Sequence, residues 1–487
     1  MEKIKKFIHQ YWLIILLTTI GAVLRLYRIE ASLQFLGDQG RDALILRNLW
    51  VKHDLPFIGP VTSVGSFFLG PLYYYLMAPF LLLANYNPVG PAIATAFIGI
   101  ITIPVLYLIT RSMLSAPAAA ITSFLYTFAA IPLEQTRSAW NPNPMPLASL
   151  GIVFGFYRAL KTKRFPWLLL SAFSLGVALQ LHYMVVFLGP FILWQLILIF
   201  KQKSLRPSLF YWFLIIILLM FPLILFELKN NFINVRGLIE YLSKNDYARF
   251  NLGQTFKDLT GRSEQAIGML LGFGEAFSQT RAWVSRAILL PAIYLLFKKP
   301  KLGYQTVFLW LFVSIIAIAF YRGRIPPYYL AFLFPVVFML VGEILSRLKG
   351  KLWLINLGFI ILFGLYNYPK IYQILTSSGN LNSVKTTAQF IKNDIDKFGY
   401  QNYNLALLDG TRDYPAHSFR YFLEVFGGRP LSQADYPQTR VLYVISPYSQ
   451  PNVLNEPIWE IKSLQPAELV GSWQFPTSEN IYKIIRL

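Results

Sequence analysis

The stretch YWLIILLTTIGAVLRLYRI, residues 11–29, is continuous, apolar and nearly free of charge. Its length matches the roughly 20 residues that an α-helix needs to cross a bilayer. The whole chain has the same character, because 55% of its 487 residues are apolar, 14% are charged and the mean hydropathy is +0.48. A bilayer offers no partner to an unpaired backbone amide, so runs of this length indicate helices rather than a barrel. The sequence therefore predicts a polytopic, all-α membrane protein.

Similar stretches recur up to about residue 369. They are separated by short connections that are rich in Lys and Arg and nearly free of acidic residues. By the positive-inside rule these connections face the cytoplasm. This assignment predicts a cytoplasmic N-terminus, an extracytoplasmic C-terminus and eleven transmembrane spans, near residues 11–29, 88–110, 115–133, 144–160, 166–181, 183–200, 207–227, 282–297, 302–321, 327–346 and 351–369.

The apolar run 67–84 is an exception. Counting it as a span would place Arg111 and every later basic connection on the wrong side of the membrane. We therefore interpret it as a re-entrant or interfacial helix in the first outer loop. The alternative is that 67–84 crosses the membrane and 88–110 does not.

From about residue 370 the composition changes to that of a small soluble α/β domain. Helical periodicity covers 384–398 and 418–426, and strand-like runs cover 404–408, 441–445, 469–475 and 481–485. The sequence thus predicts a transmembrane domain, residues 1–369, and an extracytoplasmic domain, residues 370–487. The formal charge of +21 is spread over small basic groups rather than one stripe, which argues against nucleic acid as a partner. The chain has no Cys, so disulfides and thiolate chemistry are excluded.

Two carboxylates and a guanidinium follow the first span, in the stretch GDQGRD at residues 37–42. The pattern from Arg41 to Trp50 is amphipathic and predicts a helix along the outer membrane interface, with its apolar side in lipid. A carboxylate held there can accept a proton from an incoming hydroxyl or amine, so Asp38 and Asp42 are candidate catalytic residues. The alternative for Asp38 is that its side chain caps the N-terminus of this helix.

A family resemblance emerges from motifs that all lie on the predicted outer face. After the acidic motif come GPLYYY at 70–75, QTRSAWNP at 135–142, QLHY at 180–183 and RIPPYY at 324–329. Over roughly residues 1–370, this order resembles the GT-C glycosyltransferases related to protein O-mannosyltransferases and lipid A aminoarabinose transferases. The resemblance implies a multi-pass plasma-membrane enzyme of the cell envelope. It would move a hexose or pentose, with inversion, from a polyprenyl-phosphate carrier to an extracytoplasmic acceptor.

The same resemblance implies that Asp38 is the general base. The Asp-Glu pair usual in that family reads Asp38-Gln39 here, and Asp42 follows one helical turn later as a supporting carboxylate. This departure puts a metal-bridging role in doubt. We assign no metal ligand and no certain cofactor, and a divalent metal stays an open question.

Further candidates would bind the phosphate and sugar of the donor, because arginine offers phosphate a rigid fork of donors. These residues are Arg41, Arg137, Trp140, Asn141, His182, Arg322 and Arg324. Structural alternatives exist for most of them. Arg322 and Arg324 can snorkel to the interface, His182 can simply end a helix, and residues 140–144 can form a rigid turn. Tyr328 and Tyr329 are expected in the aromatic belt, and 409–413 is expected to turn the chain.

Two other functions remain open at this level. A lipid-linked sugar flippase or transporter would fit the topology, although ion-coupled transporters need ionisable groups near the bilayer midplane and these spans nearly lack them. A non-catalytic membrane scaffold with an exported binding domain is the second. For the enzyme, a lipid, a protein hydroxyl or a polysaccharide can be the acceptor, and membrane lipids are expected partners. The exported domain is expected to help select that acceptor.

Overall fold

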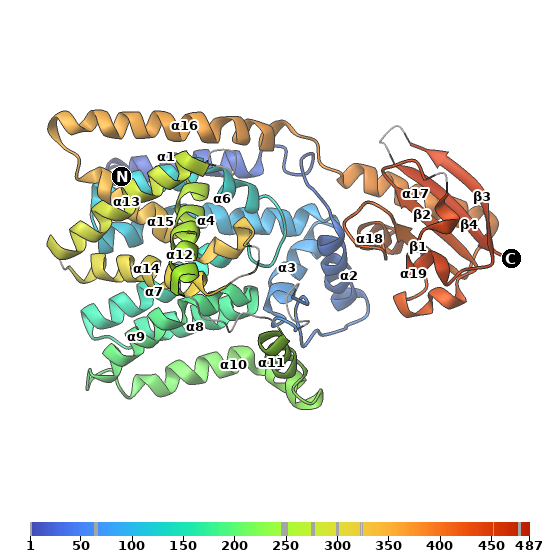
Figure 1. Ribbon diagram of the computed structural model, residues 1–487, viewed down its shortest axis with the longest axis horizontal. Coiled ribbons are helices and arrows are strands. Elements are labelled where there is room, and N and C mark those ends of the chain that lie inside the picture. The colour runs from blue at the N-terminus through green and yellow to red at the C-terminus, as the bar shows by residue number, and fades with distance from the viewer. Residues whose placement is uncertain are drawn as a thin grey trace. The chain divides into compact units, whose positions relative to one another are not determined.

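The computed structural model describes residues 2–62, 67–244, 252–273, 278–298, 301–321, 323, 325–450, 452–475 and 479–487. The chain forms two compact units (Figure 1). The helical unit comprises Met1–Tyr27, Pro56–Leu76 and Ala92–Thr376. The sheet unit comprises Arg28–Leu55, Met77–Pro91 and Ser377–Leu487. The last boundary between the units thus follows Thr376, the end of a continuous helix, whereas the sequence predicts a boundary after residue 369. In addition, two segments of the predicted first outer loop belong to the sheet unit.

Every predicted span coincides with a helix in the structure. The helices in question are α1 (Glu2–Leu26), α4 (Val89–Met113), α5 (Ala116–Phe128), α7 (Met145–Thr162), α8 (Pro166–Leu181), η1 with α9 (Tyr183–Leu188 and Gly189–Phe200), α10 (Ser208–Lys229), α13 (Ser278–Lys298), α14 (Leu302–Ala319), η4 with α15 (Pro327–Leu333 and Phe334–Ser346) and α16 (Trp353–Thr376). Among the described residues, seven helices are long and apolar enough to cross a membrane, and others such as α5 and α8 are shorter.

Other helices lie between these in the chain. They are α6 (Ala130–Gln135), α11 (Ile233–Lys244), α12 (Leu252–Leu270) and η5 (Gly350–Leu352). The apolar run near 67–84 forms α3 (Leu72–Leu83), a helix of 12 residues. At 1.5 Å per residue α3 is about 18 Å long, well below the roughly 30 Å of a hydrocarbon core. Helix α5, which coincides with a predicted span, is only one residue longer, so the interpretation that this run does not cross stays a prediction.

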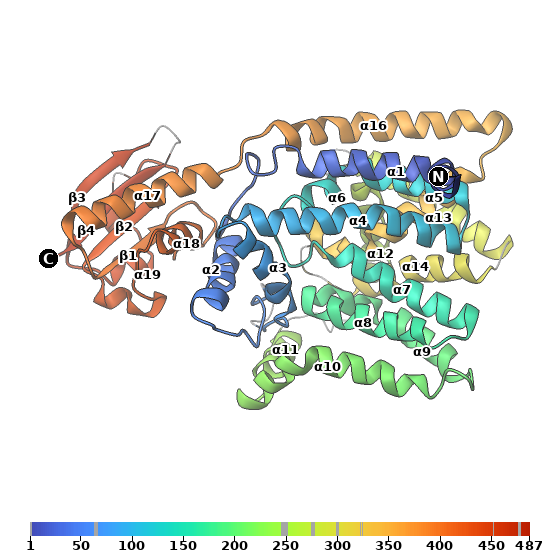
Figure 2. The same ribbon diagram turned by 180° about the vertical axis from the view of Figure 1, so that it is seen from behind.

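The sheet unit is an α/β arrangement whose elements the sequence pattern predicted closely. Its elements are α2 (Gly37–Val51), α17 (Leu381–Phe398), β1 (Tyr403–Leu407), α18 (His417–Val425), η6 (Gln433–Gln438), β2 (Val441–Ser446), η7 (Val453–Asn455), α19 (Trp459–Lys462), β3 (Ala467–Gln474) and β4 (Asn480–Arg486). The strand order is β1-β2-β4-β3 (Figure 2). The β1–β2 pair is parallel and the other two pairs are antiparallel. Every residue of β1 and β2 is buried, which explains why both strands read as continuous apolar runs.

The first-loop helix α2 packs against α18 inside the sheet unit (Figure 1). Its buried residues include Gly40, Ala43 and Leu46, which recur at the three- to four-residue spacing of one helix face. This packing differs from the predicted placement with the apolar side of α2 in lipid. The reason is that α18, which is remote in sequence, provides the apolar partner that the sequence analysis assigned to the membrane.

Candidate active site

Asp38 is the second residue of α2 and is not its N-cap. Leu36 occupies the N-cap position in extended conformation, and its N–H donates to Gln39 Oε1 at 3.1 Å. The capping alternative for Asp38 is therefore wrong, and Gln39 serves the helix terminus instead. A glutamine can make this contact as well as a glutamate, which gives Gln39 a structural role at the position where the resembling family has its second carboxylate.

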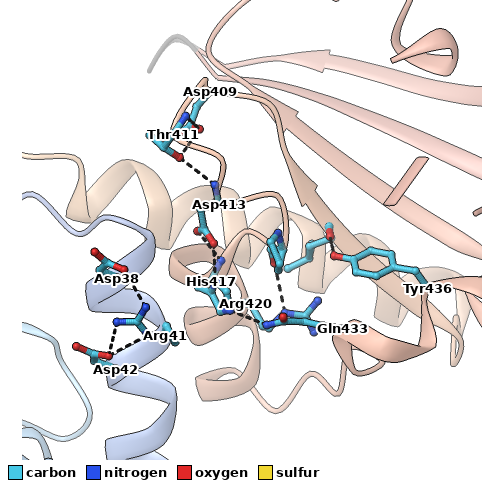
Figure 3. Close-up of polar contacts among 12 residues, drawn as sticks. Asp38, Arg41, Asp42, Asp409, Thr411, Asp413, His417, Arg420, Gln433 and Tyr436 are labelled. Atoms are coloured by element: carbon cyan, nitrogen blue, oxygen red, sulfur yellow. Dashed lines mark hydrogen bonds and ion pairs between the residues drawn. The ribbon is translucent and has the colours of Figure 1, made fainter. Parts of the chain in front are cut away.

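Arg41 lies between the two candidate carboxylates (Figure 3). Its Nη1 is 2.9 Å from Asp38 Oδ1, and its Nε and Nη2 donate to Asp42 Oδ1 at 3.1 and 2.9 Å. The Asp38 side chain is 50% exposed, whereas that of Asp42 is 3% exposed. Asp38 is thus the carboxylate that a substrate can reach, and Asp42 is a buried residue that fixes Arg41.

A bridging cation would compete with that guanidinium for the same two carboxylates. Since Arg41 already pairs with both, Asp38 and Asp42 do not fit a divalent metal. Across the ranges that the structure describes, no group of three or more His, Asp and Glu side chains is arranged to hold a metal ion.

Two glycines bring the first turn of α2 against the start of α18. An ideal Cβ on Gly37 would lie 2.4 Å from Asp413 Oδ2, and one on Gly40 would lie 2.4 Å from Ser418 N. Any larger residue would collide at either place, so glycine is needed here for close approach. The Asp413 carboxylate therefore lies directly beside the residue that precedes Asp38.

Asp413 has a role that its position in the sequence did not predict. Its Oδ2 accepts from the backbone N–H of His417 at 3.0 Å, and its Oδ1 contacts His417 Nδ1. The other ring nitrogen of His417 lies 2.6 Å from the Gln433 side-chain amide (Figure 3). Upstream, Thr411 Oγ1 accepts from the Asp413 N–H at 3.3 Å. These hydrogen bonds hold the loop 409–413 in place beside α2. In the sequence, the spacing of Asp413 four residues before His417 was the available signal.

In the helical unit, a second group gathers at the C-terminal end of α8. His182 is 6% exposed and is the C-cap of α8. Its Nδ1 accepts from the Met184 N–H at 3.2 Å, so Nδ1 carries no proton and the imidazole is neutral with its proton on Nε2. Burial lowers the pKa of His182 to about 3, which agrees with this tautomer. His182 is therefore a neutral donor rather than a cation.

Aromatic rings surround His182 and connect it to Trp140. The imidazole stacks on Tyr183 at 4.6 Å and lies 4.9 Å from the Tyr329 ring. The ring centroids of Trp140 and Tyr328 are 4.3 Å apart, and those of Tyr328 and His182 are 6.0 Å apart. Tyr328 and Tyr329 thus belong to this group of rings, whereas the sequence analysis expected them in the aromatic belt.

Asn141 joins the same place, because its Nδ2 donates to the Leu181 carbonyl at 2.5 Å. The environment of Arg137 is different, because backbone carbonyls surround its guanidinium. Its guanidinium donates to the carbonyls of Leu24, Arg25 and Tyr27 at 2.6, 3.1 and 2.8 Å, and the residue is 5% exposed. A cation at this position stabilises the C-terminus of α1, so the geometry favours a structural role for Arg137. Arg322 and Arg324 lie outside the described residues.

Solved structures share the fold of this chain. Two crystal structures of ArnT from Cupriavidus metallidurans, one bound to undecaprenyl phosphate and one in the apo state, match 97% and 98% of this chain and 98% of their own. Their TM-scores are 0.62 and 0.63, at 12% and 13% identity. The oligosaccharyltransferase AglB from Archaeoglobus fulgidus, solved with an inhibitory peptide and a dolichol-phosphate, matches 90% of this chain and 70% of its own at TM-score 0.53 and 12% identity. The chain has the GT-C fold, as predicted.

Sequence comparison gives a narrower match. A family model described as dolichyl-phosphate-mannose-protein mannosyltransferase matches residues 69–226, less than half of the chain. No curated protein sequence matches the chain. The matched segment runs from just before α3 into the last turn of α10 and includes Arg137, Trp140, Asn141 and His182.

Proposed function

We propose that this protein is an integral-membrane glycosyltransferase that transfers a sugar from a polyprenyl-phosphate-linked donor to an acceptor on the extracytoplasmic face. The observation that carries the proposal is the GT-C fold, matched over 97% of this chain to an ArnT structure that holds undecaprenyl phosphate. The mannosyltransferase family model and the dolichol-phosphate bound in AglB point to the same donor class. From the positive-inside rule we also propose a transmembrane domain, residues 1–369, and an exported domain, residues 370–487. The N-terminus would be cytoplasmic and the C-terminal domain extracytoplasmic.

In the proposed reaction, Asp38 is the general base. The acceptor hydroxyl or amine attacks the anomeric carbon of the donor sugar on the face opposite the phosphate, and its proton passes to the Asp38 carboxylate. The bond between the anomeric carbon and the phosphate oxygen breaks, and its electron pair leaves with the polyprenyl phosphate. The configuration at the anomeric carbon is therefore inverted. Phosphate is already a good leaving group, so orientation and charge stabilisation provide most of the remaining rate.

The other candidate residues take supporting roles in this proposal. Arg41 and Asp42 hold the Asp38 carboxylate in place through the two ion pairs. His182 offers its Nε2 proton to the departing phosphate, and Trp140 and Asn141 contact the donor sugar. Arg322 and Arg324 stay proposed phosphate ligands on the strength of the RIPPYY motif.

The test is Asp38→Asn in full-length protein reconstituted with undecaprenyl phosphate carrying a radiolabelled hexose or pentose. Loss of a general base lowers the rate by about 10²- to 10⁴-fold, so we expect transfer to fall by that factor in a protein that is still folded and inserted. Asp54→Asn is the matched control, because Asp54 is an exposed aspartate on the same outer loop. Near-normal transfer by Asp38→Asn would refute Asp38 as the base. A wild-type protein that moves the lipid-linked sugar between leaflets without releasing it would indicate the flippase.

A further inference from the structure

The sheet unit contains a small pocket that is separate from the Asp38 cluster. Its volume is about 110 Å³, enough for several water molecules or for part of one sugar ring. The wall is built from Glu30, the turn at 85–87, the first turn of α17 and the C-terminal part of α18. The pocket contains none of Asp38, Arg41 and Asp42, and neither Asp413 nor His417.

One side of the pocket is aromatic. Phe422 and Phe426 lie four residues apart on α18, and their rings are stacked with centroids 6.1 Å apart and planes at 26°. Phe422 is 3% exposed and packs edge-on against Phe35, so the position of this wall is fixed. Because the two rings stack one behind the other, Phe426, the more exposed of the two, is the ring that can bind the C–H face of a sugar by dispersion and exclusion of water.

The polar lining residues include one acid and one base, so their formal charges cancel. Glu30 Oε1 accepts from Asn87 Nδ2 at 2.9 Å, which fixes the Glu30 carboxylate at the rim. Lys385 and Asn382 follow on the first turn of α17. Within the described ranges their side chains make no hydrogen bond or ion pair with the protein, so their donors and acceptors are available to a ligand. One carboxylate, one ammonium and several amides match the alternating donors and acceptors of sugar hydroxyls.

An unusual backbone shapes the wall at 85–87. Asn85 and Tyr86 adopt left-handed φ values of +50° and +61°, and such a conformation is costly for an aromatic residue. The Tyr86 carbonyl accepts from the buried Tyr421 hydroxyl at 2.5 Å, and its N–H donates to the Leu81 carbonyl at 2.9 Å. Burial raises the pKa of Tyr421, so this hydroxyl stays a donor. The surrounding structure therefore holds a strained turn that directs three consecutive side chains to one pocket, as binding sites often do.

We propose that this pocket binds one neutral sugar ring of the acceptor. The zero net charge of the rim disfavours a free phosphate or a fatty acid, and an acyl chain would leave the amides and the carboxylate unpaired. The inference rests on the proposed function, since it takes the acceptor to be a glycan or glycolipid. In the sequence, Glu30 closely follows α1 and Asn87 closely precedes α4, so the ring can come from a membrane lipid headgroup or from a soluble saccharide.

The experiment measures binding without any donor. Full-length protein in lipid nanodiscs is titrated with the methyl glycosides of mannose, glucose, galactose and arabinose, and contact is detected by saturation-transfer NMR. We expect at least one glycoside to bind, and Asn382→Ala and Phe426→Ala to weaken that binding at least tenfold. Asn393→Ala is the matched control, because Asn393 is exposed on the same helix α17 and, among the residues that the structure describes, its side chain bonds only that of Gln389. Absence of binding by all four glycosides, or equal affinity of the Asn382 and Asn393 variants, would overturn the proposal.

Two additional arms identify the source of the ring and separate this proposal from the proposed function. The glycoside that binds is repeated as its dodecyl derivative embedded in the nanodisc, and tighter binding of that form assigns the ring to a lipid headgroup. Asp38→Asn should retain glycoside binding, because Asp38 does not line the pocket. If no glycoside binds while wild-type protein still releases sugar from the lipid-linked donor, only the assignment of the pocket as a sugar site is refuted. If binding persists while no donor is consumed, the proposed function falls instead.

Discussion

Replacing Gly40 with Ala should separate α2 from α18, because the added methyl group has no room. An ideal Cβ on Gly40 lies 2.4 Å from Ser418 N, 2.5 Å from Ser418 Cα and 2.6 Å from His417 C. All three are backbone atoms, so no side-chain rotation relieves the overlap. Overpacking costs about 1–3 kcal/mol, and because all three contacts here are with backbone atoms we take the upper part of that range, about 2–3 kcal/mol. Ala recovers about 1 kcal/mol of that through its higher helix propensity. The net cost of about 1–2 kcal/mol is a factor of about 5–30 in the equilibrium between packed and separated α2.

Hydrogen exchange of the full-length protein in nanodiscs reports this equilibrium directly. We expect the amides of α2 and α18 to exchange about 5–30 times faster in Gly40→Ala than in the wild type, while those of the helical unit keep their rates. Gly261→Ala is the matched control, because Gly261 lies in helix α12 and, its own helix backbone aside, no atom of the described residues is within 4 Å of its added Cβ. If exchange in α2 and α18 is the same in both variants, the close packing of the two helices is refuted. Under the proposed function, Gly40→Ala should also slow transfer, since Asp38 lies on the displaced turn.

Three further predictions concern individual side chains. Arg41→Ala should destabilise the protein by up to about 3–5 kcal/mol, because it removes a cation that pairs with the nearly fully buried Asp42 carboxylate; a melting temperature within a degree of the wild type would contradict this. His182 has a lowered pKa, so its folded form binds fewer protons than its unfolded form, and stability falls by about 1.4 kcal/mol for each pH unit below about 6.5, down to pH 3. His182→Gln should lose that part of the dependence, which thermal melts from pH 7 to pH 5 will measure. Arg137→Gln should lower the melting temperature through the lost carbonyl contacts at the end of α1 and leave the KM for donor unchanged; a raised KM in a protein of normal stability would restore the phosphate role.

The helices and strands could be predicted because their signals are local. A bilayer forces each span to satisfy its own backbone, so length and hydropathy suffice to find α4 or α10. The burial of β1 and β2 on both faces likewise produces short continuous apolar runs that need no tertiary information. The predicted strands and helices of the sheet unit therefore agree with the structure to within a few residues.

The missed features all depend on contacts between distant residues. Hydropathy describes α2 as amphipathic but does not say whether lipid or α18 covers its apolar face. Arg137 was assigned to phosphate because its residue type suits phosphate, and that role stays a prediction, but its contacts with carbonyls more than a hundred residues away could not be foreseen. Asp413 was assigned to a turn because its contacts with Gly37 could not be seen. The spacing of Gly37 and Gly40 on one helix face was a usable hint of close packing.

The sheet unit is assembled from three separate stretches of chain, and this fixes the order in which the protein can mature. The segments 28–55 and 77–91 are synthesised early, but their packing partners in 377–487 emerge last. Roughly 320 residues separate Leu55 from Ser377, so at about 5–20 residues per second the helix carrying Asp38 waits tens of seconds for α18. During that interval the turn that carries Asp38, Arg41 and Asp42 lacks the close contacts of Gly37 and Gly40 with residues 413–418. A nascent or truncated chain is therefore expected to be inserted yet inactive, and the last hundred residues act as the final step of maturation.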